Sequence, residues 1–318
     1  MKIEHQLKIG FFGTSNFALE ALRVLHKKSF SIKYVISQNP KPSGRGKKIS
    51  FSPVYRFARD NNLNVFTPKN INNSEFINKI QKYKVDFIIV VAYGKIINNQ
   101  ILKLPKFYCL NIHASILPKW RGAAPIQRAI LNGDVETGIS IIVVEPKLDA
   151  GPIVLSKNIK INHNDNAELI HNKLAKLGGD LLFKAIINIV KNEYALKNQD
   201  ELKSTYAKKI SKEETKIVWN KNAQFIHAMI RAYTPWPGAW TNWKKGNKNI
   251  RVKIMEAIII KNEDKYLLEL DIGQSNRNLI VRCQKGFVKL QKLQVEGKNI
   301  ITSKEFVNGF KLERYNFG

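Results

Sequence analysis

Residues 107–125 constrain the fold more than any other stretch of the chain, because they begin as a β-strand and end as an irregular loop. Apolar and polar residues alternate up to His113, which is typical of a strand. Pro118, Gly122 and Pro125 follow in quick succession and exclude a helix or a longer strand. A strand that opens into a rigid loop is typical of the ligand-binding edge of an open α/β sheet.

Two polar side chains lie near the end of this predicted strand. Asn111 and His113 are two residues apart, so in a strand they point to the same face. The amide of Asn111 can donate a hydrogen bond to a developing oxyanion, and the imidazole of His113 can move a proton. A single His at a strand end is more often structural than catalytic, so the pair alone leaves both interpretations open.

Asp149 favours the catalytic interpretation. It follows another apolar run and stands at a turn, in the sequence Leu-Asp-Ala-Gly-Pro. A carboxylate that reaches a His holds its tautomer and stabilises its charged form. Asn111, His113 and Asp149 are therefore the candidate catalytic residues, although periodicity alone does not bring Asp149 to His113.

The first 190 residues alternate between predicted strands and helices. The pattern predicts strands at 7–12, 31–37, 65–66 and 86–92, and helices at 17–26, 51–61 and 75–81. Two further strands, at 137–144 and 153–161, flank Asp149 and are expected to extend the sheet, and a helix at 166–190 closes the domain. This order predicts an α/β fold, with a doubly wound, mostly parallel sheet in a domain at residues 1–190.

The rest of the chain has a different character. We expect a polar linker at 191–210 and a second domain at 211–318. A capping box begins at Ser211. The pattern then predicts a helix at 223–232, short strands at 239–243, 250–260, 266–271, 279–283 and 287–295, and a late helix at 303–308. Short antiparallel strands of this spacing favour a small OB-like β-barrel.

Several kinds of site are not expected. The turn after the first strand has neither a G-x-G-x-x-G nor a P-loop sequence, so no nucleotide cofactor is predicted. Cys109 and Cys283 lack the spacing of metal ligands, so no metal is predicted. We recognise no signal peptide and no apolar run long enough for a membrane span. We expect a cytoplasmic protein that does not bind a membrane, and a monomer.

The formal net charge of +28 indicates a polyanionic partner such as RNA. An AT-biased genome would also enrich the chain in Lys, Asn and Ile, so both explanations of the charge stay open. The basic segment 38–50 follows a predicted strand at the edge where α/β proteins bind ligands. Its Pro and Gly residues predict a loop with neither helix nor strand. The candidate contacts to RNA phosphates are Lys41, Arg45, Lys47 and Lys48, although a merely solvated loop is the alternative.

The motifs together resemble a known family. Asn-x-His at 111–113, Ser-Ile-Leu-Pro at 115–118 and the later Asp149 are similar to the 10-formyltetrahydrofolate-dependent formyltransferases. Gly-Arg-Gly-Lys-Lys at 44–48 and Arg-Gly-Ala-Ala-Pro-Ile-Gln-Arg at 121–128 are similar to the branch that acts on methionyl-tRNA. The resemblance implies a Rossmann-like catalytic domain and an OB-like tRNA-binding domain. It also implies transfer of the formyl group of 10-formyltetrahydrofolate, the co-substrate, to the α-amino group of methionyl-initiator tRNA.

The family pattern implies a role for each catalytic candidate. Asn111 would donate to the oxyanion. His113 would help to stabilise that oxyanion or shuttle protons. Asp149 would orient His113 and help to relay the proton of the attacking amine.

The pattern also implies binding residues. The folate and formyl pocket would be shaped by four loop residues, Ser115, Ile116, Leu117 and Pro118. Arg45 and Lys209 match basic positions that face the acceptor stem of the initiator tRNA. Three other functions share part of the pattern: formyl transfer to an amino-sugar nucleotide, hydrolysis of 10-formyltetrahydrofolate, and RNA binding without catalysis.

Overall fold

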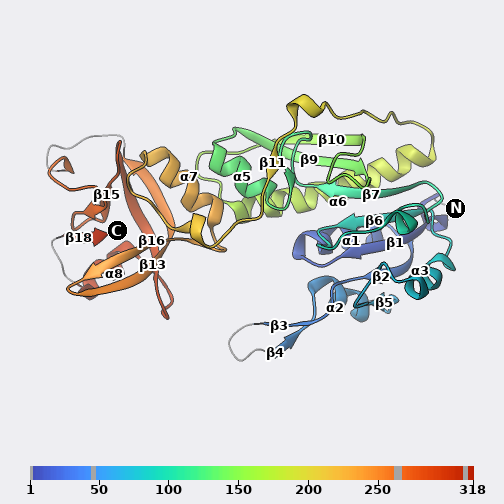
Figure 1. Cartoon of the computed structure of the whole chain (residues 1–318), viewed down its shortest axis with the longest axis horizontal. Coiled ribbons are helices and arrows are strands. Elements are labelled where there is room, and N and C mark those ends of the chain that lie inside the picture. Colours follow the sequence, from blue (N-terminus) through green and yellow to red (C-terminus); the bar gives the residue numbers. More distant parts are fainter. Residues whose placement is uncertain (1–2, 44–47, 261–266, 311–313) are drawn as a thin grey trace. The chain divides into compact units, whose positions relative to one another are not determined.

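The computed structural model describes residues 3–43, 48–260, 267–310 and 314–318. It divides into two compact units (Figure 1). The first unit consists of residues 1–122, 137–159 and 171–206, and the second of residues 123–136, 160–170 and 207–318. The chain thus passes between the units more than once, and the predicted borders at 190 and 211 stay predictions.

A seven-stranded sheet forms the core of the first unit, in the order β10-β9-β7-β6-β1-β2-β5. The five strands from β7 to β5 are parallel, and β9 is antiparallel to β7. The bounds are β1 (Lys8–Gly13), β2 (Ser31–Ile36), β5 (Val65–Phe66), β6 (Phe87–Val91), β7 (Tyr108–His113), β9 (Glu136–Val143) and β10 (Ile153–Lys160). The mostly parallel sheet is confirmed, and so is its extension by the two strands that flank Asp149.

Helices cover both faces of this sheet. On one face α6 packs against Ile112 of β7, since a Cβ added to Gly178 of α6 would lie 2.9 Å from Ile112 Cγ2. Cys109 of β7 lies instead in a buried cluster with Ile77 of α3 and Ile101 of α4. Residues three apart in a strand point to opposite faces, so the sheet is doubly wound, as predicted. The helices are α1 (Asn16–Lys27), α2 (Pro53–Asp60), α3 (Ser74–Gln81), α4 (Asn99–Leu102) and α6 (Ala167–Val190).

The chain changes direction across the sheet between β1 and β6. A 3-10 turn, η1 (Ile3–Gln6), leads into β1. After β1 the chain adds β2 and β5 on one side, and then returns to add β6 and β7 on the other. The carboxyl ends of β1 and β6, where Gly13 pairs with Val91, are therefore the switch point at which open α/β sheets bind ligands.

The basic segment 38–50 differs from its prediction. It contains two short antiparallel strands, β3 (Lys41–Ser43) and β4 (Lys48–Ser50), so the prediction of a loop with no strand was wrong. Proline is tolerated at Pro42 because a two-stranded ribbon has an open edge beyond each strand. Arg45 and Lys47 lie outside the described residues.

The second unit is built on an antiparallel barrel. β13 pairs with both β12 and β16, and this double pairing closes a ring that β18, β14 and β15 complete. The bounds are β12 (Ala239–Lys245), β13 (Lys248–Ile260), β14 (Gln274–Ser275), β15 (Ile280–Arg282), β16 (Phe287–Val295), β17 (Ile300–Thr302) and β18 (Tyr315–Phe317), with α5 (Pro125–Asn132), α7 (Ala223–Tyr233) and α8 (Ser303–Phe310) beside them. The structure confirms the OB-like barrel.

Some short elements of this unit differ from the pattern. Residues 267–271 form turns, so the strand predicted at 266–271 is wrong there; residue 266 lies outside the described part. Ser211 begins a single 3-10 turn, η3 (Glu213–Thr215), in which Ser211 N donates to Glu214 Oε1 at 2.6 Å. The closing strands β14 and β18 were not predicted, because two or three residues show no periodicity.

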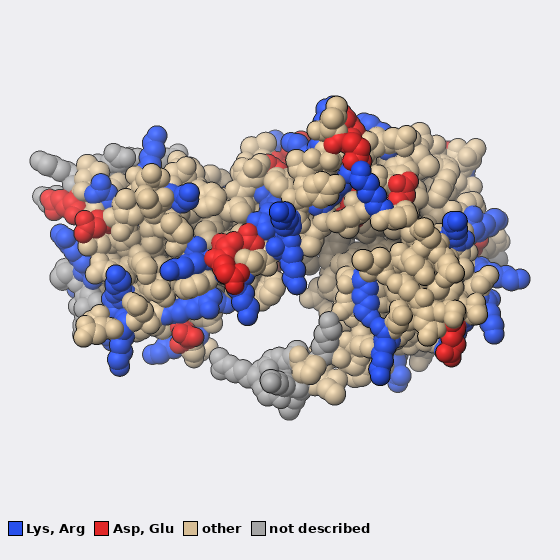
Figure 2. All heavy atoms as spheres, viewed as in Figure 1, with Lys and Arg blue, Asp and Glu red and all other residues tan. Residues whose placement is uncertain are grey.

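The surface reflects the positive charge of the sequence. Figure 2 shows Lys and Arg side chains over the visible face of both units, with fewer Asp and Glu side chains between them. They are spread over this face and do not gather in one patch. In the part of the chain that the structure describes, no helix is long and apolar enough to cross a membrane.

The second unit contains a buried histidine that predicts acid sensitivity. His227 of α7 is 2 % exposed, and its ring stacks on that of His163 at 4.9 Å. Burial lowers the pKa of His227 to about 4, with smaller contributions from the charges of Arg231 and His163. Between pH 6.5 and pH 4 the unfolded chain binds this proton and the folded chain does not, so the free energy of unfolding falls as the pH falls.

We expect the loss to reach about 2 kcal/mol between pH 7 and pH 5. Urea unfolding of the protein and of His227→Gln, at a series of pH values, measures it. The variant should show a flatter acid limb than the wild type. His26→Gln, at an exposed His of the first unit, is the control and should keep the wild-type slope. Equal slopes in all three proteins would contradict the prediction.

Candidate active site

The structure brings the three catalytic candidates together. β7 carries Asn111 and His113 to its carboxyl end, and Asp149 reaches them from the loop after β9. His113 Nδ1 lies 3.5 Å from Asp149 Oδ2, and Asn111 Nδ2 donates to Asp149 Oδ1 at 3.4 Å. His113 is 5 % exposed, so its contact with Asp149 is shielded from water. Their catalytic roles stay predictions.

A backbone carbonyl determines the tautomer of His113. Its Nε2 lies 2.8 Å from Trp120 O, and a carbonyl oxygen can only accept, so Nε2 carries a hydrogen. In the neutral ring Nδ1 is then the basic nitrogen, and it faces Asp149. Because the carboxylate would also accept a hydrogen bond from the protonated ring, His113 can gain and lose a proton at Nδ1 without turning.

Asp149 is held by strained backbone. Its Oδ2 accepts a hydrogen bond from Gly122 N at 2.9 Å, and Gly122 has a φ of 115°, which favours glycine. Ala92, Trp120 and Asp149 have φ values of 42°, 63° and 49°, in the left-handed region that L-residues rarely adopt. Ala92 and Trp120 follow the parallel strands β6 and β7, and Asp149 lies in the loop after the antiparallel strand β9. Such strain concentrates at functional sites.

The loop after β7 is held by two buried serines. Ser115 Oγ donates to Lys119 O at 2.6 Å. Ser140 Oγ donates to Ser115 O at 2.8 Å and accepts from Leu117 N at 3.1 Å. Ser115 and Leu117 therefore hold the shape of the loop, while Ile116 is half-buried.

Three further residues at this site were not predicted as functional. Arg121, in β8 (Arg121–Gly122), is 0 % exposed and donates to Gln199 and Glu201. Hydrogen bonds from Arg121, and next from Lys147, lower the pKa of Glu201 to about 2. Sequence patterns could not predict these contacts, because Gln199 is 78 residues from Arg121 along the chain. The sequence did offer one signal, since Arg121 stands between Trp120 and Gly122 in a loop that Pro118 and Pro125 make rigid.

The segment that carries Gln199 was predicted as a linker. It pairs instead with the first unit, since Ile153 and Lys197 form a β-bridge. It continues through η2 (Glu201–Lys203) to β11 (Tyr206–Ala207), which pairs with β8. Lys209 follows in the second unit and is exposed. Arg128 fixes the backbone before it by donating to Lys208 O at 3.0 and 3.2 Å.

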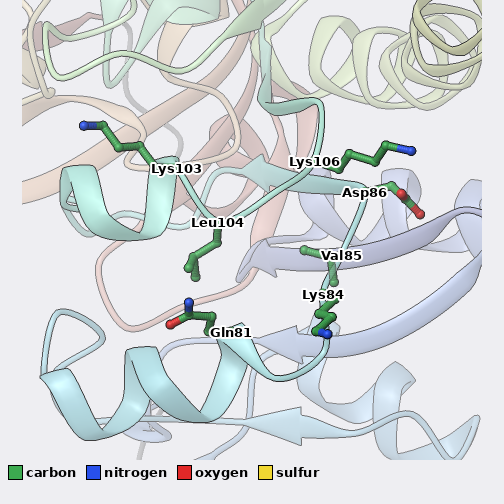
Figure 3. A pocket seen from close by; sticks show the side chains of 7 residues that line it. All are labelled: Gln81, Lys84, Val85, Asp86, Lys103, Leu104 and Lys106. Carbon is green, nitrogen blue, oxygen red and sulfur yellow. The ribbon is translucent and has the colours of Figure 1, made fainter.

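A hollow elsewhere in the first unit is separate from this site. Figure 3 shows it between the end of α3 and the amino ends of β6 and β7, with Asp86, Lys84, Lys103 and Lys106 around it. His113 stands at the carboxyl end of β7, so the hollow is at the opposite edge of the sheet. Among the described residues, no group of three or more His, Cys, Asp or Glu could hold a metal ion.

Two family models match the chain. The model for formyl transferase matches residues 7–186, and the model for the formyl transferase C-terminal domain matches residues 209–311. A methionyl-tRNA formyltransferase of Kosmotoga olearia is 41 % identical over 311 residues, which cover 96 % of this chain and 98 % of that protein. One of Bartonella quintana is 40 % identical over 308 residues, which cover 96 % and 98 %.

Solved structures share the fold. A sugar 3N-formyl transferase, WlaRD, has a TM-score of 0.66 at 24 % identity and covers 93 % of this chain and 100 % of its own. An N-formyltransferase from Helicobacter canadensis has a TM-score of 0.65 at 23 % identity and covers 90 % and 99 %. At these identities the likeness concerns the fold alone. The full-length identity to the two curated relatives is much higher, and by it the chain belongs to the methionyl-tRNA formyltransferase family.

Proposed function

We propose that this enzyme transfers the formyl group of 10-formyltetrahydrofolate to the α-amino group of methionyl-initiator tRNA. The observation that carries the proposal is the cluster of Asn111, His113 and Asp149 at the carboxyl edge of the sheet. The full-length relatives named methionyl-tRNA formyltransferase support the choice of acceptor.

The donor set of the site fits a folate that carries a formyl group. Asn111 has two amide N–H groups, and one of them points at Asp149, so the other is available to a carbonyl oxygen. The half-buried Ile116 would line the folate pocket with Pro118, and Ser115 and Leu117 would keep that wall in place. When bound, the folate supplies a formyl carbon on N10 that an amine can attack.

Each catalytic side chain has one task in this proposal. The free N–H of Asn111 stabilises negative charge that develops on the reacting oxygen, an effect of about 3 kcal/mol for one such donor. Asp149 accepts the proton that the amine of methionyl-tRNA loses. The Nδ1 atom of His113, 3.5 Å away, then takes that proton, and the carboxylate balances the imidazolium. The proton passes to N10 of the folate as the bond between the formyl carbon and N10 breaks, so that tetrahydrofolate leaves and His113 becomes neutral again.

The tRNA contacts in the proposal are basic residues. We assign the acceptor stem to the basic segment 38–50 and to the exposed position after β11; the residues are Lys41, Arg45, Lys47, Lys48 and Lys209. The net charge of +28 supports a nucleic-acid partner. We propose further that the protein works in the cytoplasm as a monomer, with the barrel as a second tRNA-binding surface.

A formylation assay tests the proposal. The protein is mixed with 10-formyltetrahydrofolate and radiolabelled methionyl-tRNA, with initiator and elongator tRNA side by side. Formyl transfer to the initiator alone is expected. Consumption of the folate without transfer would indicate a hydrolase, and no reaction with either tRNA would redirect the search to amino-sugar nucleotides.

Arg45→Ala tests the tRNA assignment. We expect weaker discrimination between initiator and elongator tRNA and an unchanged KM for the folate, because a guanidinium can meet phosphates or base edges at two points. The salt dependence of tRNA binding should fall by about one phosphate contact. Arg59→Ala removes an exposed arginine of α2 and should bind tRNA like the wild type. Full selectivity in Arg45→Ala would indicate that the segment 38–50 is merely solvated and does not bind tRNA.

A further inference from the structure

Arg121 lies at the centre of a polar network that contacts the backbone of Asp149 through Gln199. Its Nε and Nη2 donate to Gln199 Oε1 at 3.1 and 2.9 Å. Its Nη1 and Nη2 also donate to the carboxylate of Glu201 at 3.1 and 3.0 Å. The rigid, planar guanidinium thus fixes two side chains of one segment at once.

Gln199 passes this constraint to the catalytic loop. Its Nε2 donates to the backbone carbonyls of Asp149 and Gly151, each at 2.8 Å. Arg121 occupies the amide oxygen, so the amide cannot turn over and its N–H groups stay directed at the loop. Gly151 admits no adjustment on the other side, because a Cβ there would lie 1.9 Å from Val143 O. The two hydrogen bonds from Gln199 therefore hold the loop at Asp149, whose backbone has a left-handed conformation.

The backbone on both sides of Arg121 completes the arrangement. Trp120 O receives the hydrogen of His113 Nε2, and Gly122 N donates to the Asp149 carboxylate. Arg121 N itself donates to Thr205 O at 2.8 Å. The buried side chain of Arg121 thus lies between the two backbone groups that position His113 and Asp149.

We propose that Arg121 and Gln199 are positioning residues for the formyl transfer. They act through the Asp149 loop and contact neither substrate. The inference rests on the proposed function, since it assigns the purpose of the network to that reaction. It adds the segment at 199–201 to the machinery of the site.

Gln199→Glu is the sharpest test, because it separates positioning from stability. A carboxylate at 199 still accepts from Arg121, and this ion pair offsets part of the stability lost with the two carbonyl contacts. It has no N–H for the carbonyls of Asp149 and Gly151 and repels them, so the loop moves. We expect kcat to fall about 10–100-fold, with the KM values for folate and tRNA changed less than about threefold.

Two further variants complete the series. Arg121→Lys keeps the charge but not the fork, and its kcat should lie between those of the wild type and Gln199→Glu. Arg231→Lys is the control, because Arg231 is a half-buried arginine of the second unit that donates to Asp165 O at 2.8 Å and belongs to no assigned site. It should lower the melting temperature and leave kcat unchanged.

A readout without substrate makes the inference independent of the reaction. The ¹⁵N resonances of the His113 ring, assigned with His113→Asn, should move in Gln199→Glu and stay in place in Arg231→Lys. Unchanged His113 resonances with a wild-type kcat in Gln199→Glu would overturn the inference. A fall of kcat and melting temperature together, in equal measure for Gln199→Glu and Arg231→Lys, would also overturn it. Failure of the wild type to formylate methionyl-tRNA would reject the proposed function, while the resonances still decide the positioning.

Discussion

Replacing His113 by asparagine is expected to lower the rate of formyl transfer about 10²–10⁴-fold. The variant keeps a polar group at the position of Nδ1, but its amide cannot gain and lose a proton beside Asp149, and it loses the contact of Nε2 with Trp120 O. The tRNA affinity should stay at the wild-type value, because the proposed RNA contacts belong to the segment 38–50 and to Lys209. Single-turnover formylation measures the rate, and filter binding measures the affinity.

His26→Asn is the control for this variant. His26 is exposed on α1, so its replacement should change neither quantity. Turnover at the wild-type rate in His113→Asn would remove His113 from the mechanism. A loss of tRNA affinity equal to the loss of rate would instead make it a binding residue.

Replacing Asp149 by asparagine is expected to reduce the rate about 10²–10³-fold. The amide has the same size and can still accept from Gly122 N. It carries no charge to balance the imidazolium of His113 and is not basic enough to accept the proton of the amine. The loss should therefore appear in kcat, with KM for both substrates nearly constant.

The double variant tests whether the two residues work as one unit. Because the same proton passes from Asp149 to His113, the second substitution should add little to the loss of rate caused by the first. Full additivity of the two losses would show that they act separately. Asp180→Asn, at an exposed position of α6, is the control and should keep the wild-type rate.

The structure changes how the predicted pocket residues are understood. Ser115 was grouped with the folate contacts because of its motif, and its hydroxyl is bonded to Lys119 O. Leu117 is buried against Ile142 and Ile153. A motif joins residues that touch the ligand with residues that hold the loop, and only the hydrogen bonds and the burial separate the two kinds.

Local patterns predicted the elements of the first unit well. Alternation predicted β7 and placed Asn111 and His113 on one face, because the period of a strand is a property of consecutive residues. The long apolar run before Ala92 indicated a parallel strand, because a strand covered on both faces needs apolar residues throughout. Where the pattern failed, as at the ribbon of β3 and β4, the elements were too short to show a period.

Tertiary structure alone decided what these residues do to one another. Asp149 is 38 residues from Asn111, and Gln199 is 78 residues from Arg121. No periodicity extends across such distances, because the contacts depend on how strands are ordered in the sheet and on which loops then meet at its edge. The sequence by itself predicted the candidate catalytic side chains and the elements that carry them. Three features followed only from the folded chain: the tautomer of His113, the left-handed backbone of Asp149, and the hydrogen bonds from Gln199 to the Asp149 loop. Each of them depends on backbone groups that folding brings together.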